Sequence, residues 1–391
     1  MRVTNQFRDP RCIGEGMKIK DVRVFDVVGE DRSGLAVYEI ERGGLPPDKS
    51  TPHRQRFTEI ESDSGDIGLG IGGSAEVLAL GRRLIGEDPR SYETIWHTLT
   101  SRPHSVDGRS RQLSTLDVAI WDLLARSQGV SVCQMLGGPV QESIRAYAAM
   151  LGFLPEPDAA AERSAEMVKA GFTGVKWYLP NNELAGPEGF QHNVRMISAV
   201  RDAVGPDVDI MVDCILSDAS QNSLQYATRL ARSLEVLNVT WLEEPLRPED
   251  LEIYKQLRLA TRTPIAFGEH LRFRNQFVDA LSNGVASVIQ PEMHVVGGMT
   301  EMRKLVALSS SFGVPFVPHA NESCRNSIHL SFANPKRACP VAEWGVKINH
   351  NTQHFFKDFY QPVDGYFQPP SGPGFGYEID PGKVRERIEI E

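Results

Sequence analysis

From about Ile144 onward, short apolar runs alternate with segments whose apolar residues recur at helical spacing, and polar or glycine-rich residues follow each run. This repeat is typical of strand–helix units, so the apolar runs are the predicted strands. They are Ile144–Met150, Gly174–Leu179, Asp209–Cys214, Val239–Leu242, Ile265–Gly268, Ser287–Gln290, Pro315–Pro318 and a run that ends near Glu343. Eight such strands predict a barrel.

The helical segments between these strands end at glycine, which closes a last helical turn in the left-handed conformation. The pairs are Asp158–Ala170 with Gly171, Val194–Val204 with Gly205, and Thr300–Phe312 with Gly313. A doubly wound open sheet would show the same alternation. No GxGxxG follows the first strand, which disfavours that fold.

The first 140 residues lack the strand–helix repeat. Lys18–Val28 and Gly34–Glu41 resemble strands, and Ala75–Ile85 and Ser114–Arg126 resemble helices, which predicts a separate α+β domain. Phe367–Glu391 also lacks the repeat, and we expect it to return to that domain. The predicted division is 1–140 for a capping domain, 141–350 for the barrel and 351–391 for the returning segment.

Composition describes an ordinary globular chain of 391 residues with 41% hydrophobic content. A net charge of −9 argues against a bulk electrostatic attraction to nucleic acid or anionic lipid, and any anionic substrate must find a local positive site. No apolar run approaches the roughly 18 residues of a membrane helix, and MRVTNQFRDPRC does not resemble a signal peptide. We expect a cytoplasmic protein. The five scattered cysteines predict reduced thiols rather than a disulfide framework or a zinc site.

Acidic residues follow three consecutive predicted strands. Asp213 ends MVDC, Glu243 lies in WLEEP and Glu269 in FGEH. The steps, 243 − 213 = 30 and 269 − 243 = 26 residues, are each about one strand–helix unit. The three carboxylates should therefore converge at one end of the barrel. A divalent cation would relieve their repulsion, and oxygen ligands favour Mg²⁺ over zinc. Any one of these acids alone would equally suit a helix N-cap or a surface ion pair.

Two neighbours of these acids have supporting roles in this interpretation. Glu244 points away from Glu243 if the strand continues, so we expect it to support the site or the structure. His270, beside Glu269, is either a hydrogen-bond donor behind the metal or a substrate contact.

The last three strand ends supply Glu292 in IQPEMHVVGG, His319 in VPHANES and Glu343 in VAEWG. A lone histidine after a strand is more often a hydrogen-bonded core group. Here a carboxylate is available from the neighbouring strand end, and such a contact fixes the imidazole tautomer and raises its basicity. The pair His319–Glu292 is therefore a candidate general base.

The stretch GVKWYLP places Lys176 and Tyr178 two residues apart, so both side chains should share one face of a strand. They indicate either a salt-bridged core or an active site.

In this order these motifs resemble the mandelate racemase group of the enolase superfamily, over nearly the whole chain. The segment TLDVAIWDLLARSQGVSVCQMLGG and the runs VDC, WLEEP, GEH and Pro291–Gly298 carry the resemblance. It implies a modified (β/α)7β TIM-like barrel with an α+β capping domain built from both termini, and a homo-oligomer between a dimer and an octamer. It also implies roles for the strand-end residues: Asp213, Glu243 and Glu269 as Mg²⁺ ligands, His319 with Glu292 as the base, and Glu343 as the acid that hydrogen-bonds the developing enolate.

Two positions depart from the family pattern. Mandelate racemase has Lys-x-Lys where this chain has Lys176 and Tyr178, and the dyad acid is usually Asp rather than Glu292. A racemase needs a base on each face of the α-carbon, and tyrosine, with a pKa near 10, is a poor base unless Lys176 and Mg²⁺ lower that pKa. This weakens the racemase interpretation.

With Tyr178 in place of the second lysine of the second strand, the chain resembles the acid-sugar dehydratases, such as L-rhamnonate dehydratases. These enzymes are carbon–oxygen lyases. The resemblance implies that His319 takes the proton α to a carboxylate of an aldonate or aldarate, through an enediolate. Protonated His319 or Tyr178 then assists loss of the β-hydroxyl, which gives a 2-keto-3-deoxy acid. Lys176 would bind the substrate carboxylate or a metal-bound oxygen and polarise Tyr178, unless Tyr178 only packs in the barrel mouth. Alternatives are a racemase, epimerase or cycloisomerase, and a non-catalytic binding barrel.

Substrate specificity should reside in the capping domain. GGLPPDKSTPHRQR (Gly43–Arg56) is rich in Pro, Gly and basic side chains, which suits a mobile loop that closes over a polyhydroxy acid. The candidate substrate contacts are Lys49, His53, Arg54, Arg56 and, after His319, Arg325. Each of them would equally suit a solvated surface charge, so no particular sugar is indicated.

Overall fold

The computed structural model describes residues 16–32, 51–100, 109–215, 219–320 and 324–391. The strands are β1 (Ile19–Arg32), β2 (Thr51–Ser62), β3 (Ile67–Ile71), β4 (Ile144–Ala149), β5 (Gly174–Tyr178), β6 (Asp209–Asp213), β7 (Trp241–Glu243), β8 (Ile265–Phe267), β9 (Val288–Ile289), β10 (Ala342–Gly345), β11 (Tyr366–Phe367) and β12 (Glu386–Glu389). The α-helices are α1 (Ala75–Arg82), α2 (Tyr92–Thr100), α3 (Ser110–Ser127), α4 (Val132–Met135), α5 (Pro157–Lys169), α6 (Gly186–Val204), α7 (Leu224–Glu235), α8 (Leu251–Ala260), α9 (Phe273–Ser282), α10 (Met293–Val296), α11 (Met299–Ser311), α12 (Cys324–Phe332) and α13 (Val346–Thr352).

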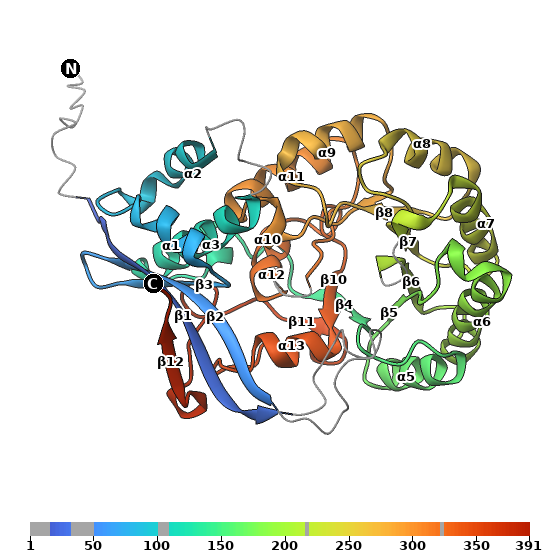
Figure 1. Ribbon diagram of the computed structural model, residues 1–391, viewed down its shortest axis with the longest axis horizontal. Coiled ribbons are helices and arrows are strands. Elements are labelled where there is room, and N and C mark those ends of the chain that lie inside the picture. The colour runs from blue at the N-terminus through green and yellow to red at the C-terminus, as the bar shows by residue number, and fades with distance from the viewer. Residues whose placement is uncertain (1–15, 33–50, 101–108, 216–218, 321–323) are drawn as a thin grey trace, which may run out of the picture.

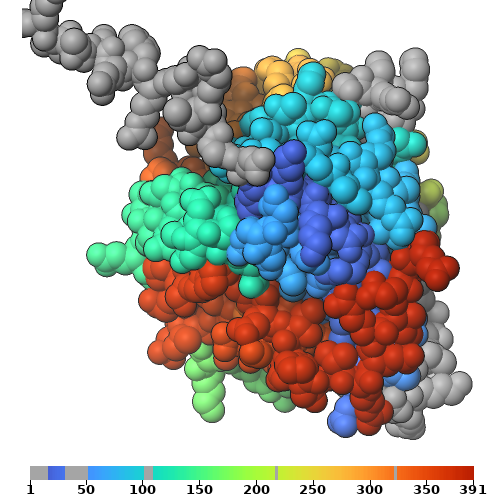
Figure 2. Space-filling model, turned by 90° about the vertical axis from the view of Figure 1, so that its left-hand side faces the viewer, coloured from blue at the N-terminus to red at the C-terminus, as the bar shows by residue number. Residues whose placement is uncertain are grey.

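The capping domain contains an antiparallel sheet in the order β12-β1-β2-β3, with α1 and α3 packed against it and α2 packed against α3. Val22 and Ile60 from the sheet and Leu116 and Ile120 from α3 belong to one buried cluster. β12 pairs with β1 so that Glu389 lies opposite Phe25. Both ends of the described chain therefore build one sheet, and Figure 2 shows the C-terminal residues, in red, beside the N-terminal strands, in blue.

The barrel is a curved parallel sheet in the order β10-β4-β5-β6-β7-β8-β9, and a ring of helices covers its outer face (Figure 1). β11 pairs antiparallel with β4. The predicted fold class is confirmed, whereas the domain boundaries near residues 140 and 350 stay predictions. Gly171, Gly205 and Gly313 follow their helices, as predicted, with φ of +96°, +79° and +69°. Gly205 has ψ of 178°, which lies outside the left-handed helical region predicted for it.

The predicted strand Pro315–Pro318 is reduced to isolated bridges. Phe316 pairs with Ile289 on one side, and its N–H donates to Ala338 O on the other. The segment therefore lies between β9 and the chain that leads into β10. Proline has no N–H to donate to a ladder, so a run with Pro at both ends forms only a short pairing.

The prediction of a loop over Gly43–Arg56 is partly wrong. Residues 51–56 belong to β2 and pair with β1, with Arg56 opposite Asp26 and Arg54 opposite Val28. The basic side chains that suggested a loop make cross-strand ion pairs instead. Residues 43–50, and with them Lys49, lie outside the described residues, as does the predicted strand Gly34–Glu41.

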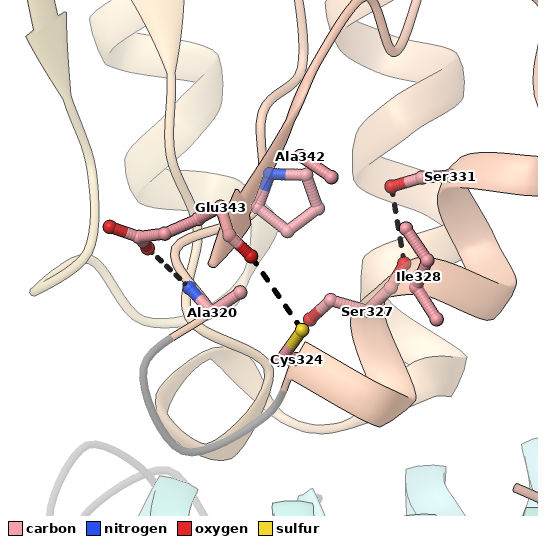
Figure 3. A pocket seen from close by; sticks show the side chains of 8 residues that line it. Ala320, Cys324, Ser327, Ile328, Ser331, Ala342 and Glu343 are labelled. Carbon is pink, nitrogen blue, oxygen red and sulfur yellow. Dashed lines mark hydrogen bonds between the residues drawn. The ribbon is translucent and has the colours of Figure 1, made fainter. Parts of the chain in front are cut away.

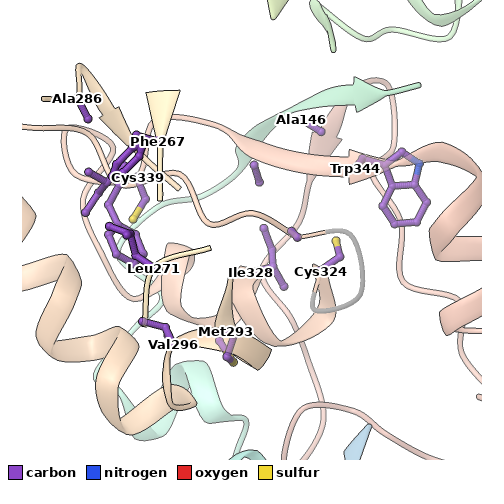
Figure 4. Close-up of a cluster of buried hydrophobic side chains, with 14 of the residues drawn as sticks. Ala146, Phe267, Leu271, Ala286, Met293, Val296, Cys324, Ile328, Cys339 and Trp344 are labelled. Atoms are coloured by element: carbon purple, nitrogen blue, oxygen red, sulfur yellow. The ribbon is translucent and has the colours of Figure 1, made fainter. Parts of the chain in front are cut away.

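Both faces of the parallel sheet are buried, as expected when helices cover it. Val175, Val212 and Phe267 face the helices in the main core, and Figure 4 shows Phe267 and Trp344 in that cluster. Side chains on the opposite, inner face include Tyr147, Met211, Trp241, Ala266 and Val317. Because strand side chains alternate, Lys176 and Tyr178 lie on this inner face too.

The four described cysteines are buried free thiols, and Cys12 lies outside the described residues. None of the helices in the described ranges combines the length and the apolar character needed to cross a bilayer.

Candidate active site

The register of neighbouring strands places Asp213 and Glu243 side by side at the carboxyl end of the sheet. Tyr178 lies opposite Asp213, and Asp213 lies opposite Glu243, across β5, β6 and β7. All three side chains are at the carboxyl end of the sheet and are almost completely buried. The sheet thus places a phenol and two carboxylates side by side.

Lys176 lies beneath this row and bridges carboxylates from three strands. Its Nζ is 2.7 Å from Glu343 Oε1 and 3.0 Å from Glu243 Oε1. It is also 3.3 Å from Asp213 Oδ2. Burial alone would lower the pKa of this ammonium, but Glu243 and Glu343 hold the pKa well above its usual value. Lys176 therefore stays positively charged and offsets the charge of the carboxylates around it.

Two further side chains hold Glu243 in place. Gln290 Nε2 donates to Glu243 Oε2 at 3.0 Å, and Trp241 Nε1 donates to the same oxygen at 3.2 Å. Sequence reasoning missed both. The only signal for Gln290 was a polar residue at the end of an apolar run, and Trp241 looked like ordinary core.

Glu269, His319 and Glu292 form a continuous chain of contacts. His319 Nδ1 lies 2.9 Å from Glu292 Oε2, and His319 Nε2 lies 2.9 Å from Glu269 Oε2. Burial alone would lower the pKa of this imidazole, but the Glu269 and Glu343 carboxylates raise the pKa well above its usual value. Burial would raise the pKa of Glu269, but His319 lowers the pKa to about 2. The dyad contact predicted for His319 and Glu292 is thus present in the geometry.

Glu343 closes the inner side of the site. Its Oε2 accepts from Ala320 N at 2.7 Å, so the carboxylate is fixed to the residue after His319 (Figure 3). Cys324 Sγ donates to Glu343 O at 3.6 Å from the start of α12. Backbone and side chain of Glu343 are therefore both anchored.

The hydroxyl of Tyr178 is buried and has no hydrogen-bond partner among the described residues. The ring packs with Leu151 and Ile348, and Lys176 Nζ lies 5.4 Å from its centroid. Burial raises the pKa of the phenol well above its usual value, although Lys176 by itself would lower it. We expected Lys176 to lower this pKa. Its effect is outweighed, because burial disfavours the charged phenolate more strongly than the neighbouring ammonium stabilises it.

The residues present fit a divalent cation. Glu243, Glu269 and His319 offer ligand atoms within 4.8 Å of one another. Asp213 is outside that group, but its Oδ2 is buried and, apart from the ion pair with Lys176, has no hydrogen-bond partner in the described part of the chain. Burial and the Glu243 carboxylate raise the pKa of Asp213 well above its usual value, which is the conflict that a cation would relieve. A set of carboxylate oxygens is the donor chemistry that Mg²⁺ prefers.

Residues 64–137 match the family model for the mandelate racemase/muconate lactonizing enzyme N-terminal domain, and residues 159–383 match the enolase C-terminal domain-like model. The second match covers more than half of the chain. The chain belongs to the mandelate racemase and muconate lactonizing enzyme group of the enolase superfamily.

Named relatives in this superfamily fall into two reaction classes. The chain is 31% identical to a D-galactarolactone cycloisomerase from Agrobacterium fabrum, over 84% of this chain and 90% of the relative. It is 30% identical to an L-rhamnonate dehydratase from Saccharopolyspora erythraea, over 93% and 97%. The solved structure of an L-talarate dehydratase from Polaromonas sp. JS666, complexed with Mg and L-glucarate, is 26% identical with a TM-score of 0.77, over 96% and 99%.

Beside the buried acids of the barrel mouth, Glu244 and His270 form a second pair. Glu244 has φ of +38° and turns its side chain to accept from Gly268 N at 2.9 Å. Its Oε2 lies 2.6 Å from His270 Nδ1, and His270 Nδ1 is also 3.4 Å from Glu269 Oε1. The hydrogen bond to Glu244 raises the pKa of His270 to about 9. Glu244 thus orients a positively charged His270 next to Glu269.

The capping-domain candidates contact the protein rather than this cluster. Arg56 Nε lies 2.6 Å from Asp26 Oδ1, and Arg54 Nη1 lies 3.3 Å from Asp26 Oδ2. His53 Nε2 is 3.2 Å from Asn351 O and packs against His354. These contacts join β2 to β1 and to the residues around α13.

Arg325 is also engaged elsewhere. Its guanidinium donates to Gly376 O and Asp358 O and lies over the Phe356 ring. These contacts tie α12 to the C-terminal segment, so we do not include Arg325 among the residues proposed to bind substrate.

Proposed function

We propose that this chain is a Mg²⁺-dependent dehydratase of an aldonate or aldarate. The observation that carries the proposal is the asymmetry of the two proton-handling groups. The pKa of His319 is raised by the Glu269 and Glu343 carboxylates, whose charge a bound cation would offset, so that in the metal-loaded protein this imidazole would act as a base. Tyr178 and Lys176 have raised pKa values and hold their protons. One base and one acid suit elimination, and racemisation would need a base on each face of the substrate.

His319 is the proposed general base. Both ring nitrogens now face carboxylates, Nδ1 toward Glu292 and Nε2 toward Glu269, so both donate. Once Glu269 is engaged by a cation, Nε2 can release its proton and present a lone pair to the substrate. A substrate that displaces this contact places its α-hydrogen before Nε2. Glu292 holds the ring orientation and stabilises the imidazolium that forms.

Tyr178 is the proposed acid. Its buried hydroxyl has no other described acceptor, so it can donate to the β-oxygen of a substrate. Proton loss from the α-carbon is followed by cleavage of the β-carbon–oxygen bond, and the leaving hydroxyl takes a proton from Tyr178 or from His319 and departs as water. The enol product then tautomerises to the 2-keto-3-deoxy acid.

We propose that Asp213, Glu243 and Glu269 hold the Mg²⁺, with Lys176 keeping Glu243 and Asp213 in position. When bound, the cation supplies positive charge next to the substrate carboxylate and makes α-proton loss feasible. Glu343, fixed by Ala320 N, faces the same side as Lys176 and is the proposed acid, which in its protonated form would donate a hydrogen bond to the enolate.

A cycloisomerase is the second candidate, because one of the relatives at 31% identity carries that name. That chemistry shares the α-proton step but releases no water. The mass of the product therefore distinguishes the two candidates, because only the dehydratase product has lost water.

The test is a proton NMR screen in D₂O, with Mg²⁺, against a panel of aldonates, aldarates and aldarolactones. Loss of the β-hydroxyl with a deuterated 2-keto-3-deoxy product is the expected result. Exchange of the α-proton without elimination would identify a racemase or epimerase, and ring opening at constant mass a cycloisomerase. No change with any compound would favour a non-catalytic barrel. Light scattering tests our further proposal of a homo-oligomer, between dimer and octamer.

A further inference from the structure

A cavity of about 280 Å³ lies between the capping domain and the barrel. Gly72, Gly73 and Ser74 line it from the loop between β3 and α1, Arg111 and Thr115 from α3, and His294 from α10. None of the proposed catalytic or metal-binding residues lines it. Ligand pockets begin near 300 Å³ and one water takes about 30 Å³, so the space suits a small molecule better than a single water.

Among the described residues, the cavity wall carries positive charge only. The remaining described lining residues are Ile71, Val77 and Gln112, so none of those that line the cavity in the described ranges is acidic. The Arg111 side chain is exposed and makes no ion pair with any described residue. Glu76, on α1, is already engaged by Arg109 at 3.0 Å and by Gln112 at 2.9 Å. The local field therefore favours an anion.

His294 reaches the cavity from the barrel. The residue is only 7% exposed, and its Nε2 is buried without a hydrogen-bond partner. A buried polar group left unpaired costs about 1–3 kcal/mol, so such groups normally have a partner. The backbone of the same residue is part of the catalytic support, because His294 N donates to Glu292 Oε1 at 3.1 Å.

The loop after β3 leaves room for an occupant. Gly72 has φ of +96°, and a Cβ there would meet only Thr115 Oγ1, at 3.6 Å. Glycine thus keeps the space between this loop and α3 open. Ser74 caps α1 by accepting from Val77 N, and the amino end of that helix carries partial positive charge.

We infer that this cavity binds a small oxyanion, a carboxylate or a phosphate, through Arg111, His294 and the amino end of α1. The occupant is either the far end of a substrate or a separate small anion, since both present the same oxygens. In both cases it contacts the residue whose amide holds Glu292, so binding in the cavity stiffens the support of the His319 dyad.

The test uses inorganic phosphate as the probe, titrated calorimetrically into the Mg²⁺-loaded protein. Arg111→Gln and His294→Phe each remove one charge-assisted or polar hydrogen bond, so each should weaken binding about tenfold or more. Arg82→Gln is the matched control, because Arg82 is exposed on α1 and does not line the cavity. Thermal melts check that all variants fold. No binding to the unsubstituted protein, or equal affinity in Arg111→Gln, overturns the inference.

Steady-state kinetics then separates the two sources. Competitive inhibition by phosphate, with a raised KM in Arg111→Gln, identifies the far end of the substrate. Inhibition or activation without a change in KM identifies a separate anion. The calorimetric result does not depend on turnover, so the proposed dehydration can fail while the cavity still binds phosphate, and the reverse also holds.

Discussion

Two buried acids, Asp122 in the capping domain and Asp213 in the barrel, differ in the hydrogen bonds that their carboxylate oxygens accept. In the capping domain, Asp122 Oδ2 accepts from Leu69 N at 2.9 Å and from Arg126 Nε at 2.6 Å, and its Oδ1 accepts from Phe375 N at 2.7 Å. In the barrel mouth, Asp213 Oδ2 lies 3.3 Å from Lys176 Nζ but accepts no hydrogen bond from any described residue.

Burial raises the pKa of both carboxyls. Two backbone amides and Arg126 cover both oxygens of Asp122. Asp213 accepts from Ile215 N through Oδ1 at 2.8 Å, and its Oδ2 has the ion pair with Lys176 but keeps room for an external partner. A saturated acid indicates a structural joint and an unsaturated acid indicates a binding site.

The largest effect should come from the base. His319→Asn removes the proton acceptor and keeps a polar group toward Glu292, so turnover should fall by about 10³-fold or more. The metal should still bind, which a Mg²⁺-dependent rise in melting temperature would show. If α-proton exchange in D₂O continued in this variant, the base would have to be assigned to another group.

The same substitution at the two acids tests the comparison directly. Asp122→Asn should lower the free energy of unfolding by about 3 kcal/mol, because one backbone amide or Arg126 loses a charged acceptor. Asp213→Asn should leave stability without Mg²⁺ unchanged or higher, since it removes a repelled carboxylate, but abolish the Mg²⁺-dependent rise in melting temperature. Urea unfolding with and without Mg²⁺ measures both. Equal destabilisation by the two substitutions would refute the distinction.

Tyr178→Phe should reduce activity less than His319→Asn does, and it should not destabilise the fold. Loss of the acid should reduce turnover about 10- to 100-fold, whereas the free energy of unfolding should stay the same or rise, because an unpaired buried hydroxyl is removed. Full activity would make Tyr178 a packing residue, alongside Leu151 and Ile348.

The last prediction concerns the dependence of stability on pH, far from the proposed active site. Cys133 N donates to His329 Nδ1 at 3.0 Å, and burial lowers the pKa of this imidazole to about 3. The unfolded chain binds the proton near pH 6.5, so stability falls as pH drops below that value, by about 1.4 kcal/mol per unit. His329→Asn keeps an acceptor for Cys133 N and should remove this part of the slope between pH 6 and pH 4. His97→Asn, on an exposed helix position, is the control and should keep it.

The repeat of apolar runs predicted most of the barrel because parallel strands covered by helices are buried on both faces. The acids of β6, β7 and β8 were predictable for the same reason, since each ends a strand and strand ends share one face. The contacts of Lys176 were not predictable. Glu243 and Glu343 lie 67 and 167 positions further along the chain (243 − 176 and 343 − 176), and only closure of the sheet brings them to one ammonium.

Other features could not be predicted because the residue types in a short segment indicated one structure, whereas contacts with distant parts of the chain favoured another. The polar start of β2 looked like a loop, yet Asp26 on the neighbouring strand provides the partner that its arginines need. The pKa of Tyr178 depended on desolvation, which a list of neighbouring charges does not contain. His294 carried no recognisable motif, and only the cavity beside it gives its side chain a role.

The pairing of β12 with β1 also sets an order of events during synthesis. Phe25 and Glu389 are 389 − 25 = 364 positions apart, so the β12–β1 ladder is a contact of very long sequence separation. The sheet of the capping domain cannot be completed until residue 389 has left the ribosome, whereas the strands of the barrel can already pair. For that interval the edge of β1 is an open template for other nascent chains, and chaperone protection would matter most there.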